Sequence, residues 1–400
     1  MSNWAQLTTG ERIKHLRGKE LTQSQLAEAA EVSLSLVQKA EQDRGELSLG
    51  SLLKLAAALK TDVGVILGQQ APRRGMSHDT RAALRQLSDA VHDSALGEWE
   101  GLTDPSSLDE LSRARDLAWA AYWRGDTTAF AGLAAQVLVE GRARYAGAQG
   151  YEKQQLGLLL ATMYQYASST AILLGQRELA LGALTSSRTL ALQAGDPYVS
   201  VLVDSTLSWI HLRNARVAKA VSVAERAAAR IEPSFSKPNQ PQLIAFGRLM
   251  ISAAVAAARG GNAASANDYL SQAHAAAARL GKDADLYGTY FGPSFAAAEA
   301  VGIAVSLGEY GRALKLAQRT ELPPSVPKLA RNRYKLDVAL AQVENRLYDQ
   351  AANTLIEVAL DAPEWVRHQA LPGVIGKRLA KVATAQVRRI SDVIGVQLIA

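Results

Sequence analysis

Hydrogen-bonding side chains follow one face of a short segment near the amino terminus of the chain. The spacing of apolar residues predicts a helix over about 34–42, in which Val37 and Ala40 form the buried face. The opposite face carries Ser35, Gln38, Lys39 and Gln42, with Leu34 at its leading end. Hydroxyl, amide and ammonium groups on an exposed helix can hydrogen-bond to base edges in the major groove of DNA. On an isolated amphipathic helix, the same side chains would simply be solvated.

The surrounding sequence predicts a frame of short helices with sharply defined starts. The pairs Thr8/Glu11 and Thr22/Gln25 have the spacing of capping boxes. Apolar pairs flank three predicted N-caps in the positions of a hydrophobic staple, and these pairs are Leu21/Leu26, Val32/Val37 and Leu47/Leu52. The predicted helices are one that opens at Thr8, then about Gln23–Ala30, Leu34–Gln42, Leu49–Leu59 and Val63–Leu67.

A turn of roughly three residues separates the second and third of these helices. Such a short turn sets one helix steeply across the other, so that the second projects from the surface and fits the major groove. Within a five-helix frame, DNA binding is favoured over the solvated interpretation of the polar face. We therefore expect residues 1–70 to form a helix-turn-helix DNA-binding domain.

The motif Leu21-Thr22-Gln23-Ser24-Gln25-Leu26-Ala27, followed by Val32-Ser33 and Val37-x-x-x-Glu41, resembles the XRE (phage-repressor-like) helix-turn-helix family. The resemblance implies that Gln23 binds phosphate and that Glu41 pairs with Arg17 to hold the fold. It places the base-contacting positions at Leu34, Ser35 and Lys39, with Gln38 at the edge. The full set of expected DNA-contacting residues is Gln23, Ser33, Leu34, Ser35, Gln38, Lys39 and Gln42.

Two positions depart from the family pattern. Glu31 stands in the turn where the family usually has glycine, so we expect either a strained backbone or a different turn. Leu34 replaces the usual polar residue, and it either contacts a thymine methyl group or makes no contact of consequence.

After a break at Gln69–Gly75, residues 71–104 are expected to form a linker and a connecting helix near Asp79–Ala95. From residue 105 to 400, long apolar-periodic helices alternate with similar short turns, at Arg124–Asp126, Leu174–Gln176, Arg213–Ala215, Arg259–Gly261, Leu307–Glu309 and Asn345–Leu347. A small apolar residue follows each turn, and these are Ala129, Ala180, Ala218, Ala266, Ala313 and Ala351. The anchors recur at roughly 38 to 51 residues, as in helical-hairpin repeats. The expected fold is therefore all-α: a five-helix head followed by a curved, tetratricopeptide-like solenoid.

Several motifs of the body resemble the C-terminal part of large actinobacterial XRE-type regulators. They include Gly195-Asp196-Pro197, Tyr290-Phe291-Gly292-Pro293-Ser294, Leu336-Asp337-x-Ala339 and Ala362-Pro363-Glu364. This resemblance implies a cytoplasmic transcription regulator with a tetratricopeptide-like sensor or dimerisation body, and it implies no particular ligand.

Catalytic and metal chemistry finds little support in the sequence. There is no cysteine, and the six histidines are scattered without the i, i+4 spacing of a metal site. No P-loop or nucleophile-elbow motif occurs. We therefore expect no enzyme activity, no metal and no cofactor. No secretory signal or membrane span is predicted either, in keeping with a cytoplasmic protein.

The charge distribution bears on the expected partners. The net charge is +6, but residues 1–70 carry eight Lys or Arg and eight Asp or Glu, so the head is neutral. Because a neutral head lacks the charge for tight single-site binding, we expect a homodimer that binds a palindromic double-stranded operator. The basic segment Lys377-Arg378-x-x-Lys381 is expected to be a solvated face.

Aromatic residues in the body are either hairpin core or the lining of a groove that binds a peptide or small-molecule effector. The candidates for the groove are Tyr164, Trp209, His211, Arg213, Tyr287 and Tyr290. The alternative is a body that docks a partner protein and has no small effector.

Overall fold

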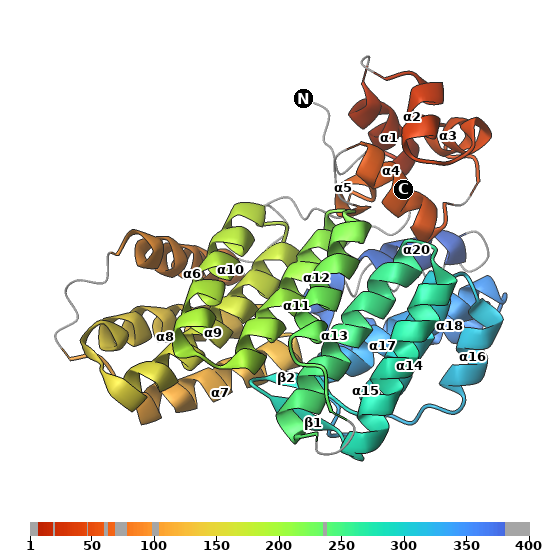
Figure 1. The fold of residues 1–400 in the computed structure, drawn as a ribbon. Coiled ribbons are helices and arrows are strands. Elements are labelled where there is room, and N and C mark those ends of the chain that lie inside the picture. Colours follow the sequence, from red (N-terminus) through yellow and green to blue (C-terminus); the bar gives the residue numbers. More distant parts are fainter. Residues whose placement is uncertain are drawn as a thin grey trace.

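The computed structural model describes residues 7–18, 21–45, 47–59, 63–68, 78–97, 104–234 and 238–380, without the side chains of His78 and Arg81. In this part of the chain, a small helical head is followed by a larger helical body (Figure 1). The expected all-α class is confirmed, with the addition of one small β-hairpin. The expected break at Gln69–Gly75 and the basic residue Lys381 lie outside the described residues.

The head contains the five helices that the capping pattern predicted. They are α1 (Thr9–Arg17), α2 (Gln23–Ala29), α3 (Leu34–Glu41), α4 (Leu49–Ala58) and α5 (Val63–Ile66). Both capping boxes are formed, because Thr8 and Thr22 each accept a bond from the backbone three residues later while Glu11 and Gln25 bond back. Ser33 and Ser48 cap α3 and α4 in the same way. The satisfied N–H groups fix where each helix begins.

In the described residues, the body comprises α6 (His78–Leu96), six helical hairpins and two short helices that follow them. The hairpins are α7 (Leu108–Arg124) with α8 (Thr127–Gly147), α9 (Gly150–Leu173) with α10 (Arg177–Ala194), α11 (Pro197–Arg213) with α12 (Val217–Ala229), α13 (Gln240–Arg259) with α14 (Ala263–Leu280), α15 (Pro293–Ser306) with α16 (Tyr310–Ala317), and α17 (Lys328–Glu344) with α18 (Tyr348–Asp361). The chain then forms α19 (Pro363–Arg367) and α20 (Ala370–Leu379). All six predicted turns coincide with hairpin turns.

A buried apolar residue follows each turn, and in two hairpins it is not the residue that was predicted. The fourth residue of the second helix is a fully buried alanine in five hairpins, namely Ala180, Ala220, Ala266, Ala313 and Ala351. Ala218 is therefore wrong as an anchor, because it is exposed while Ala220 faces the partner helix. In the first hairpin, Phe130 takes the place that Ala129 was expected to fill.

The body closes into a ring. The first helices of the hairpins contact one another in the order α7, α9, α11, α13, α15 and α17, and α17 contacts α7 again. The closure is fastened where Thr80 on α6 donates to Glu364 Oε1 on α19 at 2.9 Å, and where Trp123 Nε1 donates to Gly288 O at 3.0 Å. The expected curved repeat array is thus closed on itself in the described residues, because its two ends meet.

A β-hairpin, which the sequence did not predict, fills the space beside α13. Strands β1 (Ala284–Leu286) and β2 (Thr289–Phe291) pair antiparallel around a turn in which Tyr287 has φ 52° and Gly288 has φ 77°. Phe291 is fully buried against Gly247 on α13, where only a residue without a side chain leaves room for the ring.

The helix α13 also passes a simple test for a membrane span by length and composition. However, 72% of its apolar stretch is buried within the body, which accounts for its composition as a core helix of the ring.

The head rests on the body through several contacts. Helix α4 contacts α13, and the exposed Lys377 on α20 reaches the head and donates from Nζ to Thr9 Oγ1. Arg378 is only 10% exposed and forms an ion pair with Glu344. The expectation of a solvated basic face is thus wrong for Arg378, which is paired within the body, whereas Lys377 remains exposed while it bonds to the head.

The surroundings of Gly247 on α13 and Gly132 on α8 predict opposite effects of a glycine-to-alanine substitution on the free energy of unfolding. A Cβ atom on Gly247 would lie 2.0 Å from Phe291 Cζ, so we expect Gly247→Ala to lower the free energy of unfolding by about 1–3 kcal/mol. Around Gly132 on α8, the described chain has no atom within 4 Å of an added Cβ. Gly132→Ala should therefore stabilise the helix by about 0.5–1 kcal/mol. Denaturant unfolding of both variants checks this, and a similar change in both would contradict it.

Candidate nucleic-acid interface and the cavity of the body

Helix α3 presents the two faces that its sequence predicts. Val37 and Ala40 are buried, and they hold the helix against the head. The expected outward residues Ser35, Gln38, Lys39 and Gln42 are all exposed, and Leu34 is 41% exposed. The structure thus brings the predicted side chains together on one accessible surface.

Two of the expected DNA-contacting residues also have roles inside the head. Ser33 Oγ accepts from Leu36 N at 3.2 Å and so fixes the start of α3. The half-buried Gln23 donates from Nε2 to Glu41 Oε2 at 2.7 Å, which links the start of α2 to the end of α3. These bonds set the orientation of α3 relative to α2.

Glu41 is the centre of a buried polar network. Arg17 donates to it from Nε at 2.5 Å and from Nη2 at 3.1 Å, so the expected pair between these residues is confirmed. Burial alone would raise the pKa of Glu41, but the bonds from Arg17 and Gln23 outweigh it and hold this pKa below its ordinary value. The pKa of Arg17 is raised, chiefly by its bond to Glu41. The pair therefore stays ionised at neutral pH.

The loop after α3 contains Asp43, whose carboxylate makes a further contact with the start of α1. Gly10 N donates to Asp43 Oδ1 at 2.9 Å, and the hydroxyl of Thr8 donates to the same carboxylate. A carboxylate at the first turn of α1 is favoured by the exposed N–H groups there. The contact joins the start of α1 to the end of α3, and since it spans 33 positions, sequence spacing alone gave no signal for it.

Glu31 adopts the strained conformation that its place in the turn predicts. Its φ is 49°, in the left-handed region that favours glycine. The backbone carbonyl of Glu31 accepts from Lys54 Nζ at 3.4 Å. Of the two expected outcomes, a strained backbone or a different turn, the strained backbone is therefore the one observed.

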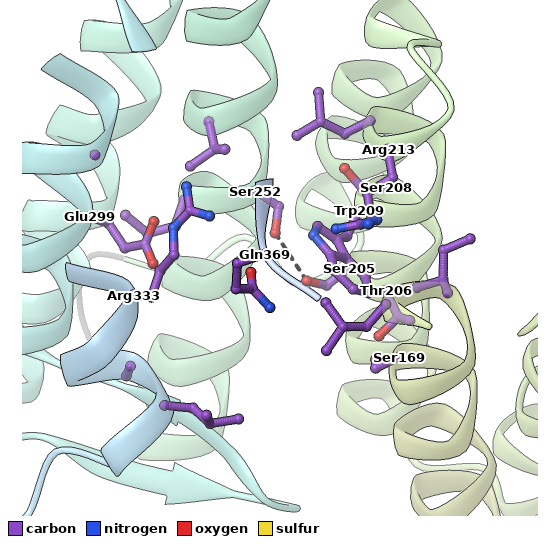
Figure 2. A pocket seen from close by; sticks show the side chains of 18 of the residues that line it. Ser169, Ser205, Thr206, Ser208, Trp209, Arg213, Ser252, Glu299, Arg333 and Gln369 are labelled. Carbon is purple, nitrogen blue, oxygen red and sulfur yellow. Dashed lines mark hydrogen bonds between the residues drawn. The ribbon is translucent and has the colours of Figure 1, made fainter. Parts of the chain in front are cut away.

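The ring of the body surrounds a cavity of about 370 Å³. Its lining comes from the first helices of the hairpins, α7, α9, α11, α13, α15 and α17, together with β2, α19, α20 and their neighbouring residues. Polar side chains from α11 and α13 face those from α15 and α17 across the space (Figure 2). Of the six residues predicted to line a groove, Trp209, Arg213 and Tyr290 lie at this cavity.

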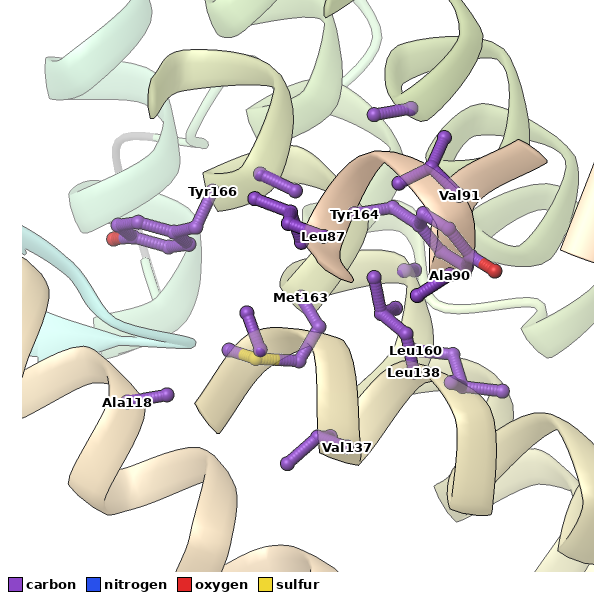
Figure 3. Close-up of a cluster of buried hydrophobic side chains, with 14 of the residues drawn as sticks. Leu87, Ala90, Val91, Ala118, Val137, Leu138, Leu160, Met163, Tyr164 and Tyr166 are labelled. Carbon is purple, nitrogen blue, oxygen red and sulfur yellow. The ribbon is translucent and has the colours of Figure 1, made fainter. Parts of the chain in front are cut away.

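The other three predicted groove residues lie elsewhere. Tyr164 is fully buried among Leu87, Val91 and other apolar side chains, and its hydroxyl accepts from Arg142 Nε at 2.9 Å (Figure 3). Tyr287 and His211 are outside the lining of the cavity. The assignment of Tyr164 is corrected because its ring is fully buried in the core, whereas effector contacts of Tyr287 and His211 stay predictions.

The head forms part of the cavity wall. Leu49 and Leu53 on α4, and Val63 and Gly64 on α5, line the same space as the residues of the ring. Short-range patterns in the sequence could not predict this arrangement, because it joins residues that are far apart along the chain. A molecule in the cavity would contact both of them.

Comparison with known proteins identifies the head. Residues 13–66 match the helix-turn-helix family. A stretch of 65 residues is 43% identical to the immunity repressor protein of Bacillus phage phi105, and it covers 16% of this chain and 45% of that protein. The chain thus spans less than half the length of the relative that it matches. No solved structure matches the chain.

The lowered pKa of Glu41 predicts how the head responds to acid. The stabilisation is present above the unfolded pKa, near 4.5, and is lost as the pH falls through the lower folded value. Glu41→Gln should cost about 1.5–3 kcal/mol at pH 7 and should flatten the acid dependence. Hydrogen exchange of backbone amides in α1–α3 of the full chain measures both the loss of stability at pH 7 and its dependence on acid pH. The exposed Glu28→Gln is the control, and an acid dependence in Glu41→Gln equal to that of the wild type would refute the prediction.

Proposed function

We propose that this protein is a sequence-specific DNA-binding transcriptional regulator whose head binds double-stranded DNA through α3. The observation that carries the proposal is the exposed polar face of α3 within a region that matches the helix-turn-helix family. The similarity to a protein named as an immunity repressor supports the same function. A regulator of transcription acts in the cytoplasm, and we infer that location here.

The chemistry of each exposed side chain suggests which base or phosphate group of the DNA it would contact. An amide such as that of Gln38 pairs with adenine, and the ammonium of Lys39 pairs with guanine or a phosphate. Ser35 can bond either kind of base edge, and Leu34 offers an apolar surface to a thymine methyl group. Gln23, Ser33 and Gln42 flank this face, where contacts to the phosphate backbone position the helix.

We further propose that the protein binds a palindromic operator as a homodimer. The head is neutral overall, so one head gains little from phosphate attraction. Two heads on one body would bind half-sites about one helical turn apart and would roughly double the contact surface. The larger body is the part of the chain suited to hold such a dimer.

The repeat body, which we take to be tetratricopeptide-like, would supply a regulatory input rather than catalysis. Because α4 and α5 line its cavity, a small molecule bound there would favour some arrangements of head and body over others. A coupling of about 1–3 kcal/mol changes operator affinity about 5- to 150-fold. The competing function, a body that docks a partner protein, does not account for a cavity shared with the head.

Substitution of α3 tests the proposed DNA contacts. Duplexes selected from a random library by the wild-type protein define the operator. Replacing Ser35, Gln38 and Lys39 together with alanine should remove the preference for this operator, with a loss of about 1–3 kcal/mol for each good base contact. Fluorescence anisotropy of labelled operator and of scrambled DNA measures the preference.

Arg188→Ala on the exposed surface of α10 is the matched control, because it removes one positive charge far from α3. It should leave the operator preference unchanged. A triple variant that remains folded and binds the operator as tightly as the wild type would exclude α3 as the contact surface.

The oligomeric state tests the second part of the proposal. We expect light scattering at micromolar concentration to give about twice the chain mass of 42.7 kDa, with two heads bound per operator. A mass of one chain that remains unchanged on operator DNA would exclude the dimer and leave the α3 contacts intact.

A further inference from the structure

The cavity of the ring contains more positive than negative groups. Arg213, Arg248, Arg259 and Arg333 line it, and its acidic lining residues are Glu299 and Asp337. Arg333 is paired with Asp337 at 3.2 Å, so one acid is already neutralised within α17. The charges of Arg333 and Arg213 act on Arg259 at this cavity, and a bound anion would offset the repulsion among them.

Arg259 has a buried hydrogen-bond donor that lacks an acceptor in the described part of the chain. Its Nε atom is buried and has no hydrogen-bond partner among the described residues. Desolvation, and next the charge of Arg333, lower the pKa of Arg259 to about 10. A buried donor without an acceptor costs about 1–3 kcal/mol, and most buried polar groups in native proteins have a hydrogen-bond partner. An oxygen with negative charge would satisfy this one.

Helices α11 and α13 add a flat apolar surface and hydroxyl groups to the lining of the cavity. The guanidinium of Arg213 lies 5.4 Å from the centre of the Trp209 ring, so that an aromatic face and a cation adjoin. Ser205 on α11 and Ser252 on α13 bond to each other across the two helices at 3.0 Å (Figure 2). Figure 2 also shows Arg333 and Glu299 facing this wall from the opposite side.

We propose that the cavity binds a small organic anion, with its carboxylate, phosphate or sulfonate group at Arg259 and its apolar part against Trp209. The proposal rests on the effector role proposed for the body, and it specifies the class of ligand. The cavity volume of about 370 Å³ lies at the lower end of the range of about 300–1,000 Å³ for small-molecule sites.

A matched pair of dyes tests the charge requirement. The probe 1-anilinonaphthalene-8-sulfonate joins a sulfonate to an aromatic system, and N-phenyl-1-naphthylamine has the same rings without the charge. Fluorescence titration of the full chain should show one bound sulfonate dye per chain, at least tenfold tighter than the neutral dye. If the neutral dye binds as tightly or more tightly, the anion proposal is overturned.

Substitutions locate the bound dye. Arg259→Met should weaken binding of the sulfonate dye at least tenfold and leave binding of the neutral dye within twofold of the wild type. Arg248→Met gives the same test if Arg259→Met fails to unfold cooperatively. Arg188→Met, on the exposed surface of α10, is the control. The proposal is overturned if the cavity variant binds the sulfonate dye like the wild type, or if the control weakens it equally.

Operator binding without dye is measured in parallel on the same samples. Loss of the dye site with intact operator binding would reject the anion site and keep the DNA-binding function. Intact dye binding by a wild-type protein that selects no operator would reject the DNA-binding function and keep the site.

Discussion

Closure of the six hairpins into a ring is the constraint on which both the cavity and the contact between head and body depend. A ring closes only if each hairpin keeps its two helices close together, and small residues make this possible. Ser168 donates to Ala180 O, and Ser208 to Ala220 O, each at 2.8 Å and across 12 positions of sequence. The residue with this spacing before the anchor is small and buried in the other hairpins as well: Ala118, Ala254, Val301 and Ala339. A larger residue at any of these places would push two helices apart and shift every later hairpin.

The ring divides the helices of the body into two classes with different chemistry. The first helix of each hairpin faces the cavity, and the second helix covers the outside. Within the described residues, the lining includes residues from the first helices, α7, α9, α11, α13, α15 and α17, and none from the second helices. This division explains why a helix as apolar as α13 carries Arg248 and Arg259. On the outer layer such charges would be solvated, whereas on the inner layer they are kept only where they can meet a partner.

Much of the head, and the outline of the body, could be predicted from sequence because short-range rules decide them. Caps such as Thr22 and Ser33 act within three residues, and hairpin turns interrupt a helical period that is visible over a few turns. Ala218 was a mistaken anchor because periodicity fixes a face only to within a residue or two. The contacts of Asp43 with α1, the burial of Tyr164 and the closure of the ring depend on residues far apart in sequence. The sequence did contain one indication of the cavity, namely charged residues within otherwise apolar first helices. Arg259 on α13 and Glu299 on α15 are examples.

The contact between the head and the ring would give the proposed effector a physical means to influence DNA binding. A ligand shifts a conformational equilibrium only by its difference in affinity for the two states. A molecule enclosed by the ring alone would contact the same atoms wherever the head lay, and it would have no such difference. Leu53 and Val63 belong to the head and line the cavity, so an occupant gains or loses contact as the head moves. Helix α4 also packs against α2, which Gln23 and Glu41 bond to α3. The path from the cavity to the exposed face of α3 is therefore a short chain of packed helices and buried hydrogen bonds.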